Sequence, residues 1–379
     1  MADTVMIVTG ETSGELYGSL LAASLKERLP GIRIIGIGGE LMKEAGVELI
    51  SGFSSAFGVA ELVSSLSSLK ETFRRAVAAL VIQKPSVLVL IDYPDFNLRL
   101  AAEARKRQVR ILYYVSPQVW AWRKRRVHKI ARLVDRMAVI LPFEEGIYQG
   151  AGLRTEFVGH PVMDEIRQSG RDRTRLKGEL GLQEDMPVVA LLPGSRPHEL
   201  QRLLPLLLEV LREGKKAFPP CQFCMPFAPN TDLGRHDEMV RQFRAEGAVI
   251  SQGESLRVLA VSDLAVIASG TASLQAALLG VPMVVIYKLF PLTYWLARLI
   301  VKVKYISLVN ILSHRGVVRE FIQGDATPGN IMQELSRIMS DTGYRDAMLR
   351  SFEEVRRMFE GRNASARVSE IVIEMGGWK

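Results

Sequence analysis

Small and hydroxyl residues form a turn at Ser269-Gly270-Thr271, and their types and spacing suit the binding of a diphosphate. The turn separates an apolar run, Leu264 to Ala268, from a stretch of helical composition, Ala272 to Leu279. In a parallel sheet, such a unit directs the helix N-terminus and its unpaired N–H groups out of the carboxyl edge of the sheet, where an anion is favoured. An ordinary βαβ turn that binds nothing has the same sequence character, so both interpretations stay open.

A second turn of this kind is Pro193-Gly194-Ser195-Arg196, which follows the apolar run Val188 to Leu192. Gly194 and Ser195 permit close approach to the backbone, and Arg196 suits a two-pronged contact with phosphate. The two turns together predict an anion-binding region in the C-terminal half of the chain.

A third turn, Gly10 to Glu15 (GETSGE), follows the first apolar run of the chain. Its two glycines allow a tight turn where a ligand can lie, and we expect Thr12 or Ser13 to cap a helix over Leu16 to Arg28. The spacing differs from G-x-G-x-x-G, so a dinucleotide fingerprint is not supported. Glu11 is either a catalytic residue or a partner of the helix dipole.

Val87 to Ile91 predicts a buried strand that delivers Asp92-Tyr93-Pro94-Asp95 at its carboxyl end, where open α/β sheets place their chemistry. Asp92 would be held on a rigid element and partly desolvated, which suits a general base. Two aspartates three residues apart could also ligate a metal, but no other carboxylates cluster with them. A role in capping the following turn is the alternative for Asp92.

Ser116 to Arg126 (SPQVWAWRKRR) places two tryptophans beside four consecutive cations. Aromatic stacking with positive charge suits single-stranded nucleic acid, a membrane interface or a phosphosugar. The net charge of +8 and the pI near 9.5 likewise indicate acidic partners without choosing among them.

The length of 379 residues, with 48% hydrophobic and 24% charged residues, predicts two domains with separate cores. We expect them over 1–167 and 186–345, joined by a polar linker at 168–185. Helices over 346–379 would pack back on the N-terminal domain or on a partner subunit. The lone pair Cys221 and Cys224 lacks half the ligands of a structural zinc site. Scarce cysteine and no signal peptide predict a cytoplasmic protein.

Two segments are unusually apolar. Phe53 to Leu69 is rich in serine and apolar residues, and it predicts an amphipathic helix that either meets lipid or covers the domain core. Leu289 to Tyr305 mixes aromatics, aliphatics and cations, and it is too short and too charged to span a bilayer. Amphipathic contact with one leaflet fits this second segment better.

A series of motifs runs through the chain in a fixed order: GETSGE, GIGG at 36–39, FGVAE at 57–61, IDYPDFN at 91–97, YYVSPQVWAWRKRR at 113–126, LPFE at 141–144, FVGHP at 157–161, LLPGSR at 191–196, ASGTASLQAALLGVPMVV at 268–285 and YISLVN at 305–310. In this order the motifs resemble those of the lipid-A-disaccharide synthase family over nearly the whole chain. SPQVWAWR is highly specific in combination with PFE and VGHP, whereas ASGTA followed by a helix is shared with other two-domain glycosyltransferases and related epimerases.

The resemblance implies a GT-B fold and an inverting transfer of diacylglucosamine from its UDP derivative to the 6-hydroxyl of a diacylglucosamine 1-phosphate. Asp92 would be the base, with Glu11 as its rival, and Asn310 matches a family position near the reacting sugars. Substrate and UDP contacts would come from the following residues: Ser13, Gly14, Arg123, Gly194, Ser195, Arg196, Ser269, Gly270, Thr271, Ala272 and Gln275.

The same resemblance implies that the partners are these UDP-activated and 1-phosphorylated acyl-glucosamine lipids, met at the inner leaflet of the membrane by a peripherally bound cytoplasmic protein. No cofactor, no metal and no nucleic acid are expected, and a homodimer stays open. Glu15 stands where the family usually has aspartate, and Gln275 stands where many relatives have a glutamate expected to bind the ribose. A UDP-sugar epimerase of similar fold and a basic nucleic-acid-binding protein remain the alternatives.

Overall fold

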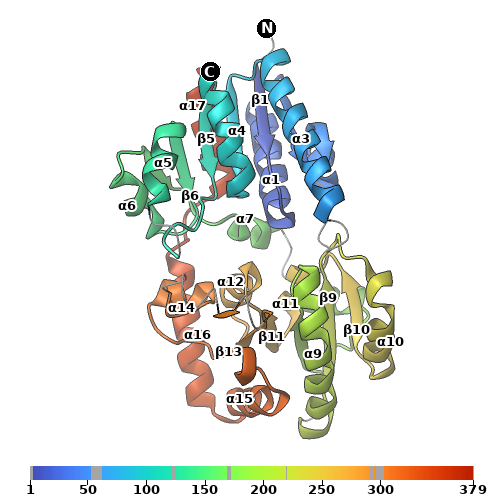
Figure 1. Ribbon diagram of the computed structural model, residues 1–379. Coiled ribbons are helices and arrows are strands. Elements are labelled where there is room, and N and C mark those ends of the chain that lie inside the picture. Colours follow the sequence, from blue (N-terminus) through green and yellow to red (C-terminus); the bar gives the residue numbers. More distant parts are fainter. Residues whose placement is uncertain are drawn as a thin grey trace. The chain divides into compact units, whose positions relative to one another are not determined.

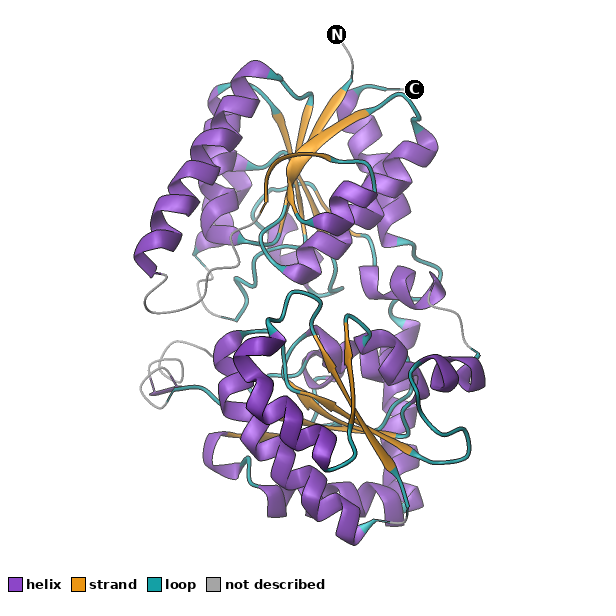
Figure 2. Cartoon of the chain, turned by 90° about the vertical axis from the view of Figure 1, so that its right-hand side faces the viewer, coloured by secondary structure: helices purple, strands orange, loops and turns teal. Residues whose placement is uncertain are grey.

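The computed structural model describes residues 3–52, 62–121, 125–168, 172–218, 220–290, 294–295 and 303–378 (Figure 1). The chain divides into two compact units: unit 1 is Met1–Asp164 with Gly361–Lys379, and unit 2 is Glu165–Glu360. Within each unit a parallel sheet lies between helices (Figure 2). The expected α/β architecture with two parallel sheets is therefore confirmed.

In the described residues, unit 1 has a seven-stranded parallel sheet in the order β3-β2-β1-β4-β5-β6-β7. The strands are β1 Thr4–Val8, β2 Arg33–Gly38, β3 Glu48–Gly52, β4 Val87–Ile91, β5 Arg110–Tyr114, β6 Arg136–Val139 and β7 Thr155–Phe157. The helices are α1 Thr12–Arg28, α2 Glu40–Glu44, α3 Leu62–Ile82, α4 Pro94–Lys106, α5 Arg126–Leu133, α6 Glu144–Gln149, the first half of α7 Pro161–Gln168, and α17 Ala364–Gly376.

The strand order of unit 1 reverses between β1 and β4. β1 pairs with β2 on one side and with β4 on the other, and every residue of β1 and β4 is buried, because helices cover both faces of the sheet. Open α/β sheets bind ligands outside the carboxyl ends of the strands at such a switch point. The turns after these two strands carry Glu11 and Asp92.

Unit 2 repeats this plan with a six-stranded parallel sheet, counted over its described residues, in the order β10-β9-β8-β11-β12-β13. The strands are β8 Val188–Leu192, β9 Gln222–Phe227, β10 Val249–Gln252, β11 Leu264–Ala268, β12 Met283–Tyr287 and β13 Glu320–Ile322. The helices are α8 Arg173–Glu179, α9 Pro197–Ala217, α10 Asp237–Ala245, α11 Ser255–Val261, α12 Thr271–Leu278, α14 Leu308–Ser313, α15 Pro328–Ser340 and α16 Thr342–Arg357, with short 3₁₀ turns η1 Leu233–His236 and η2 Gln323–Asp325. Its switch point lies between β8 and β11, whose turns are 194–196 and 269–271.

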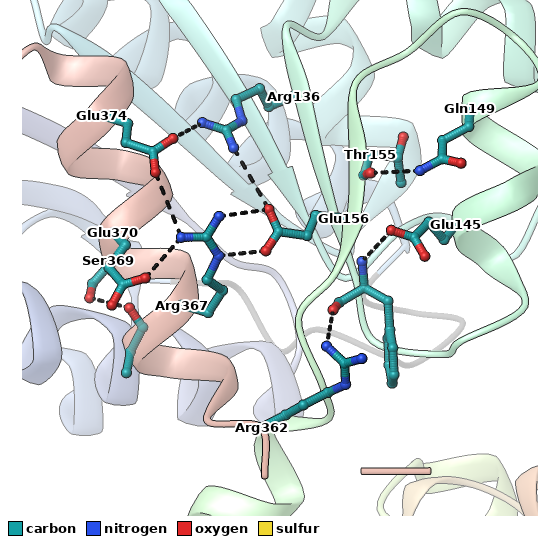
Figure 3. A network of polar contacts seen from close by, with 12 residues as sticks. Arg136, Glu145, Gln149, Thr155, Glu156, Arg362, Arg367, Ser369, Glu370 and Glu374 are labelled. Atoms are coloured by element: carbon teal, nitrogen blue, oxygen red, sulfur yellow. Dashed lines mark hydrogen bonds and ion pairs between the residues drawn. The ribbon is translucent and has the colours of Figure 1, made fainter. Parts of the chain in front are cut away.

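The C-terminal helix α17 returns to unit 1, where it packs on α1 and beside β4 and β5 (Figure 1). Figure 3 shows the ion pairs that hold it there. The nearly buried Arg136 of β6 pairs with Glu374 of α17, and Arg367 of α17 donates to Glu156 of β7 at 2.9 Å. The last helix of the chain is thus an integral part of unit 1.

A buried carboxylate fixes the start of α17. Asp164 is 3% exposed, and its Oδ2 accepts hydrogen bonds from the backbone N (2.9 Å) and the Oγ (2.8 Å) of Ser365. Asp164→Ala leaves both donors unpaired, so we expect the free energy of unfolding of unit 1 to fall by about 3 kcal/mol in urea titrations. Ser365→Ala keeps the backbone contact and should cost about 1 kcal/mol. An Asp164→Ala protein as stable as the wild type would show that α17 docks without this contact.

The start of α1 differs from the sequence prediction. The helix begins at Thr12, so Glu11 is the N-cap residue, and Ser13 and Gly14 lie in the first helical turn. The prediction that Thr12 or Ser13 caps a helix from Leu16 was therefore wrong. Gly14 is therefore a helical residue, where an added Cβ would make ordinary contacts with Thr9 and Ile91.

The unit boundaries also differ from those we expected. The chain passes from unit 1 to unit 2 inside α7, and α8 occupies the middle of the predicted linker at 168–185. α16, which we grouped with the C-terminal helices, belongs to unit 2, and α17 alone returns to unit 1. Among the helices of the described residues, none is long and apolar enough to cross a membrane.

Candidate active site

The turn Ser269–Thr271 lies at the carboxyl end of β11 and leads directly into α12. Ser269 Oγ donates to Ile306 O at 3.1 Å, so this hydroxyl holds the turn itself. No described side chain caps α12, and open space surrounds its N-cap residue, Gly270. The first N–H groups of α12, at Thr271 and Ala272, therefore lie where an anion can approach them.

The neighbouring turn at Gly194–Arg196 differs, because Glu199 folds back over it. The Glu199 carboxylate accepts hydrogen bonds from Ser195 N and Arg196 N, each at 3.3 Å. Gly194 has φ +93°, and a Cβ there would lie 2.4 Å from Glu199 Oε2, so only glycine admits this contact. The N–H groups that we expected to hold phosphate are already paired. The guanidinium of Arg196 also pairs with Glu199, at 3.5 Å from its Oε1, but half of this side chain is exposed.

Gln275 lies one turn into α12, and its Nε2 donates to Glu165 Oε2 at 3.1 Å. Burial raises the pKa of Glu165, and the hydrogen bond from Gln275 opposes this shift. Glu165 was missed in the sequence because it lies 110 residues from Gln275, with no motif linking the two. It supplies a carboxylate beside the position where the resemblance implies one.

Asn310 is buried, and its side chain is fully used within unit 2. Its Nδ2 donates to Val318 O (2.9 Å) and to Glu320 Oε1 (2.8 Å). Its Oδ1 accepts from Val317 N (2.7 Å) and Val318 N (2.9 Å). Since an amide has two donor hydrogens and two acceptor positions, none is left for a substrate. Asn310 therefore fixes the segment between α14 and β13.

At the switch point of unit 1, Asp92 follows β4 directly, as predicted. Asp92 and Tyr93 have φ of +48° and +47°, in the left-handed region that residues other than glycine rarely adopt. Strained conformations of this kind cluster at functional sites. Asp92 O accepts from Asn97 Nδ2 (2.7 Å) and Tyr113 Oη (2.6 Å), and Asp92 N donates to Tyr114 O (3.2 Å). The backbone of Asp92 is thus locked while its side chain stays only partly buried.

Glu11 lies at the end of β1, the strand next to β4. The preceding Gly10 packs against the Tyr93 ring, where a Cβ would lie 2.2 Å from Tyr93 Cγ. Burial raises the pKa of Tyr93, and the negative charges of Glu11 and Asp95 add to this effect. The structure therefore brings both candidate bases to one edge of the sheet, and Gly10 is required there for close packing.

The second aspartate of the motif plays a separate part. Asp95 is exposed in the first turn of α4 and pairs with Arg126 Nη2 at 2.9 Å. Over the described ranges, no group of three or more His, Cys, Asp or Glu side chains is arranged to hold a metal ion. Cys221 and Cys224 are both free thiols.

Glu144 of the LPFE motif was not singled out in the sequence, yet it is only 1% exposed. Its Oε1 accepts from Trp120 Nε1 (3.0 Å) and its Oε2 from Leu141 N (3.3 Å). Burial raises the pKa of Glu144 to about 7, against the effect of these donors, and the charge of Asp92 adds to the rise. An acidic residue at a helix start usually interacts with the helix dipole at the surface, so its position in the sequence does not indicate burial.

The pKa of Glu144 predicts a pH dependence. Folding favours its protonated form, so its contribution to stability is complete below about pH 4.5 and is lost as the pH rises through 7. Glu144→Gln stays neutral, so its unfolding free energy relative to wild type should rise by about 3 kcal/mol between pH 4.5 and 8. Urea titrations at several pH values measure this difference. If the difference in unfolding free energy between Glu144→Gln and wild type stays constant between pH 4.5 and 8, the pKa of Glu144 is not raised in the folded protein.

Glu15, one of the two departures from the family pattern, has a structural role. It is buried in α1, and its Oε1 accepts from Leu41 N at 2.9 Å at the start of α2. Burial raises its pKa, while this hydrogen bond opposes the shift. Gly39 is needed for the approach, since a Cβ there would lie 2.4 Å from Glu15 Oε1.

Some predicted residues lie outside the described part of the chain. Arg123 falls within 122–124, and the first nine residues of the Phe53 to Leu69 segment fall within 53–61, after which α3 begins at Leu62. Most of Leu289 to Tyr305 falls within 291–293 and 296–302. The described residues of that segment include Phe290 and Trp295, and the side chains of both are exposed.

Comparison of the fold shows that the two units form an α/β protein of the GT-B glycosyltransferase type. CalG4, the calicheamicin glycosyltransferase, is similar over 100% of this chain and 99% of its own, with a TM-score of 0.61 and 17% identity. The UDP-GlcNAc 2-epimerase from Neisseria meningitidis, solved with UDP-GlcNAc, covers 98% of both chains with a TM-score of 0.65. At 10% identity it shares the fold alone.

Sequence comparison gives the family. A model described as lipid-A-disaccharide synthetase matches residues 5–372. The lipid-A-disaccharide synthase of Syntrophus aciditrophicus is 42% identical over 93% of this chain and 92% of its own. That of Myxococcus xanthus is 39% identical over 98% and 97%. The chain belongs to the lipid-A-disaccharide synthase family and is a glycosyltransferase of lipid A biosynthesis.

Proposed function

We propose that the protein transfers the diacylglucosamine unit of UDP-2,3-diacylglucosamine to the 6-hydroxyl of 2,3-diacylglucosamine 1-phosphate, with inversion, giving the disaccharide 1-phosphate and UDP. The polar groups at the two switch points support this assignment beyond the family name. In unit 2 the N-terminus of α12 has no side-chain cap and lies beside the turn of Arg196. In unit 1 the partly buried carboxylate of Asp92 belongs to a residue whose backbone is held by hydrogen bonds. The first suits a diphosphate, and the second suits a base.

Each unit has a distinct part in the proposed reaction. In unit 2, the N–H groups of α12 and the Arg196 guanidinium hold the diphosphate and stabilise the charge that develops on UDP as it leaves. In unit 1, Asp92 accepts the proton of the acceptor hydroxyl as its oxygen attacks the anomeric carbon. Helix dipoles and a guanidinium carry the leaving-group charge, so this reaction requires no metal ion.

We infer that the protein acts at the inner leaflet of the membrane as a peripheral protein, because both proposed substrates are lipids. Phe290 and Trp295 support this placement, because 57% and 64% of their surfaces are exposed in a segment rich in cations and aliphatics. Replacing both by alanine should lower partition onto anionic vesicles about tenfold, since each loses apolar area that lipid would cover. Unchanged sedimentation with vesicles would move the contact to another surface.

Acceptor dependence separates this function from that of the epimerases that share the fold. A transferase releases UDP from UDP-2,3-diacylglucosamine only when the 1-phosphate acceptor is present. An epimerase changes the sugar nucleotide without any acceptor. We expect UDP release to require the acceptor; conversion of the sugar nucleotide alone would contradict the proposal.

A further inference from the structure

The loop that follows β5 starts from a strained residue. Ile91 of β4 pairs in register with Tyr114 of β5, so Asp92 and Val115 are the next residues on two adjacent strands. Val115 has φ +61°, which is a genuine outlier for a β-branched side chain. Strain of this kind persists only where the surrounding structure holds it. The loop after Val115, residues 116–120, therefore needs a support.

The support comes from the segment that follows the next strand, β6. Glu144 accepts from Trp120 Nε1 at 3.0 Å, and Tyr148 Oη donates to Pro117 O at 2.8 Å. The Phe143 ring meets the Trp120 ring edge-to-face, with centroids 5.2 Å apart. Both Glu144 and Tyr148 are buried, so these contacts are shielded from water.

We propose that Glu144 is a positioning residue of the transfer reaction, which holds the 116–120 loop in place beside Asp92 through its hydrogen bond to Trp120. This inference rests on the proposed function, since it gives the loop a part in the step that Asp92 catalyses. Glu144 touches no reacting atom in this role. It acts on the reaction through the indole of Trp120 and the backbone that carries it.

The chemistry of Glu144 suits a positioning residue. A buried carboxyl group is costly, and a hydrophobic side chain would fill the same space at lower cost, but it would leave the Trp120 N–H and the Leu141 N–H without acceptors. One carboxyl oxygen accepts from Trp120 and the other from Leu141, so Glu144 links the loop to the segment before α6. Asp92 and Val115 follow paired residues of adjacent strands, so the loop starts beside the proposed base.

The test compares two variants that disturb the contact from opposite sides. Glu144→Gln replaces one carboxyl oxygen by an NH₂ group, so the Trp120 N–H or the Leu141 N–H loses its acceptor, and Trp120→Phe removes the indole N–H. Glu145→Gln is the matched control, because Glu145 is the next residue of α6 and its Oε1 accepts from Phe157 N at 3.2 Å, away from the loop. For each protein, kcat, the KM of both substrates, UDP affinity and the melting temperature are measured.

We expect Glu144→Gln and Trp120→Phe each to lower kcat about tenfold or more, since small misplacements of groups near the reacting atoms lower the rate strongly. UDP affinity should stay unchanged, because UDP binds unit 2, and Glu145→Gln should keep its kcat within about twofold. The double variant should be no slower than the slower single variant, because both changes break one contact.

A wild-type kcat in either folded variant would overturn the inference, and so would multiplied losses in the double variant. A fall in kcat shared equally by Glu145→Gln would overturn it as well. If Glu144→Gln does not fold, the folded Trp120→Phe variant decides alone, on its kcat and UDP affinity. A wild-type protein that makes no disaccharide would instead remove the proposed function itself.

Discussion

We expect Asp92→Asn to lower turnover by about 10² to 10⁴, the usual cost of losing a general base, while UDP affinity stays at the wild-type value. Asparagine is the right replacement for this position. Asp92 has φ +48°, and asparagine adopts this left-handed conformation more readily than most residues do. Asn97 and Tyr113 donate to the backbone oxygen of Asp92, so these two hydrogen bonds survive the change.

Glu11→Gln is the comparison that makes this result decisive. Glu11 lies at the end of the adjacent strand, and it is the N-cap residue of α1. Its replacement should cost less turnover than that of Asp92, because Glu11 lies three residues beyond β1, whereas Asp92 follows β4 directly and its backbone oxygen accepts from Asn97 and Tyr113. A folded Asp92→Asn enzyme with most of its rate, beside an inactive Glu11→Gln enzyme, would transfer the role of base to Glu11.

The second large effect concerns UDP. Arg196→Ala should weaken UDP binding by roughly 1.5 to 3 kcal/mol, the scale of a hydrogen bond to a charged group. Glu199 pairs with the N–H groups of Ser195 and Arg196 and, at 3.5 Å, with the guanidinium of Arg196. Because this guanidinium is half exposed, it is the group of the turn that we expect to meet the diphosphate. Calorimetric titration with UDP measures the change.

A control on the same helix completes this test. Arg212→Ala removes a cation of α9 that pairs with Glu246 at the surface, and it should leave UDP affinity unchanged. Equal UDP affinity in Arg196→Ala and wild type would assign the diphosphate to the α12 N-terminus alone. Equal loss in both variants would show only a general effect of net charge.

Much of the fold could be predicted because the central strands are continuous apolar runs. β4, β8 and β11 have the bounds that their composition predicts, since strands buried on both faces of a parallel sheet leave no room for polar residues. The edge strands β3, β7 and β13 were missed. They are short and partly exposed, so they lack this signal.

The candidate site was predictable where chemistry follows a strand directly, as at Asp92 and Ser269. It was not predictable where a side chain acts across the sequence. Glu199 covers the Gly194–Arg196 turn, which the sequence indicates to be open. The side-chain amide oxygen of Asn310 accepts from the backbone N–H groups of residues 317 and 318. Glu144 and Glu165 act on partners 24 and 110 residues away. Such pairs depend on tertiary packing, which residue spacing does not encode.

The return of α17 to unit 1 has the same cause. Its sequence indicates an amphipathic helix, but its partners lie about 200 residues earlier or more, on elements that the fold alone brings beside it. They are Arg136 and Glu156, which Figure 3 shows, and Asp164. The sequence therefore left the choice between this unit and a partner subunit open.

The most direct measurement is the product itself. The protein is incubated with UDP-2,3-diacylglucosamine and 2,3-diacylglucosamine 1-phosphate, and the lipid products are separated and examined by mass spectrometry and NMR. The account predicts one disaccharide 1-phosphate per UDP released, linked through the 6-hydroxyl, with the anomeric configuration opposite to that of the donor. Free sugar, an epimerised sugar nucleotide, or a disaccharide that retains the donor configuration would contradict it.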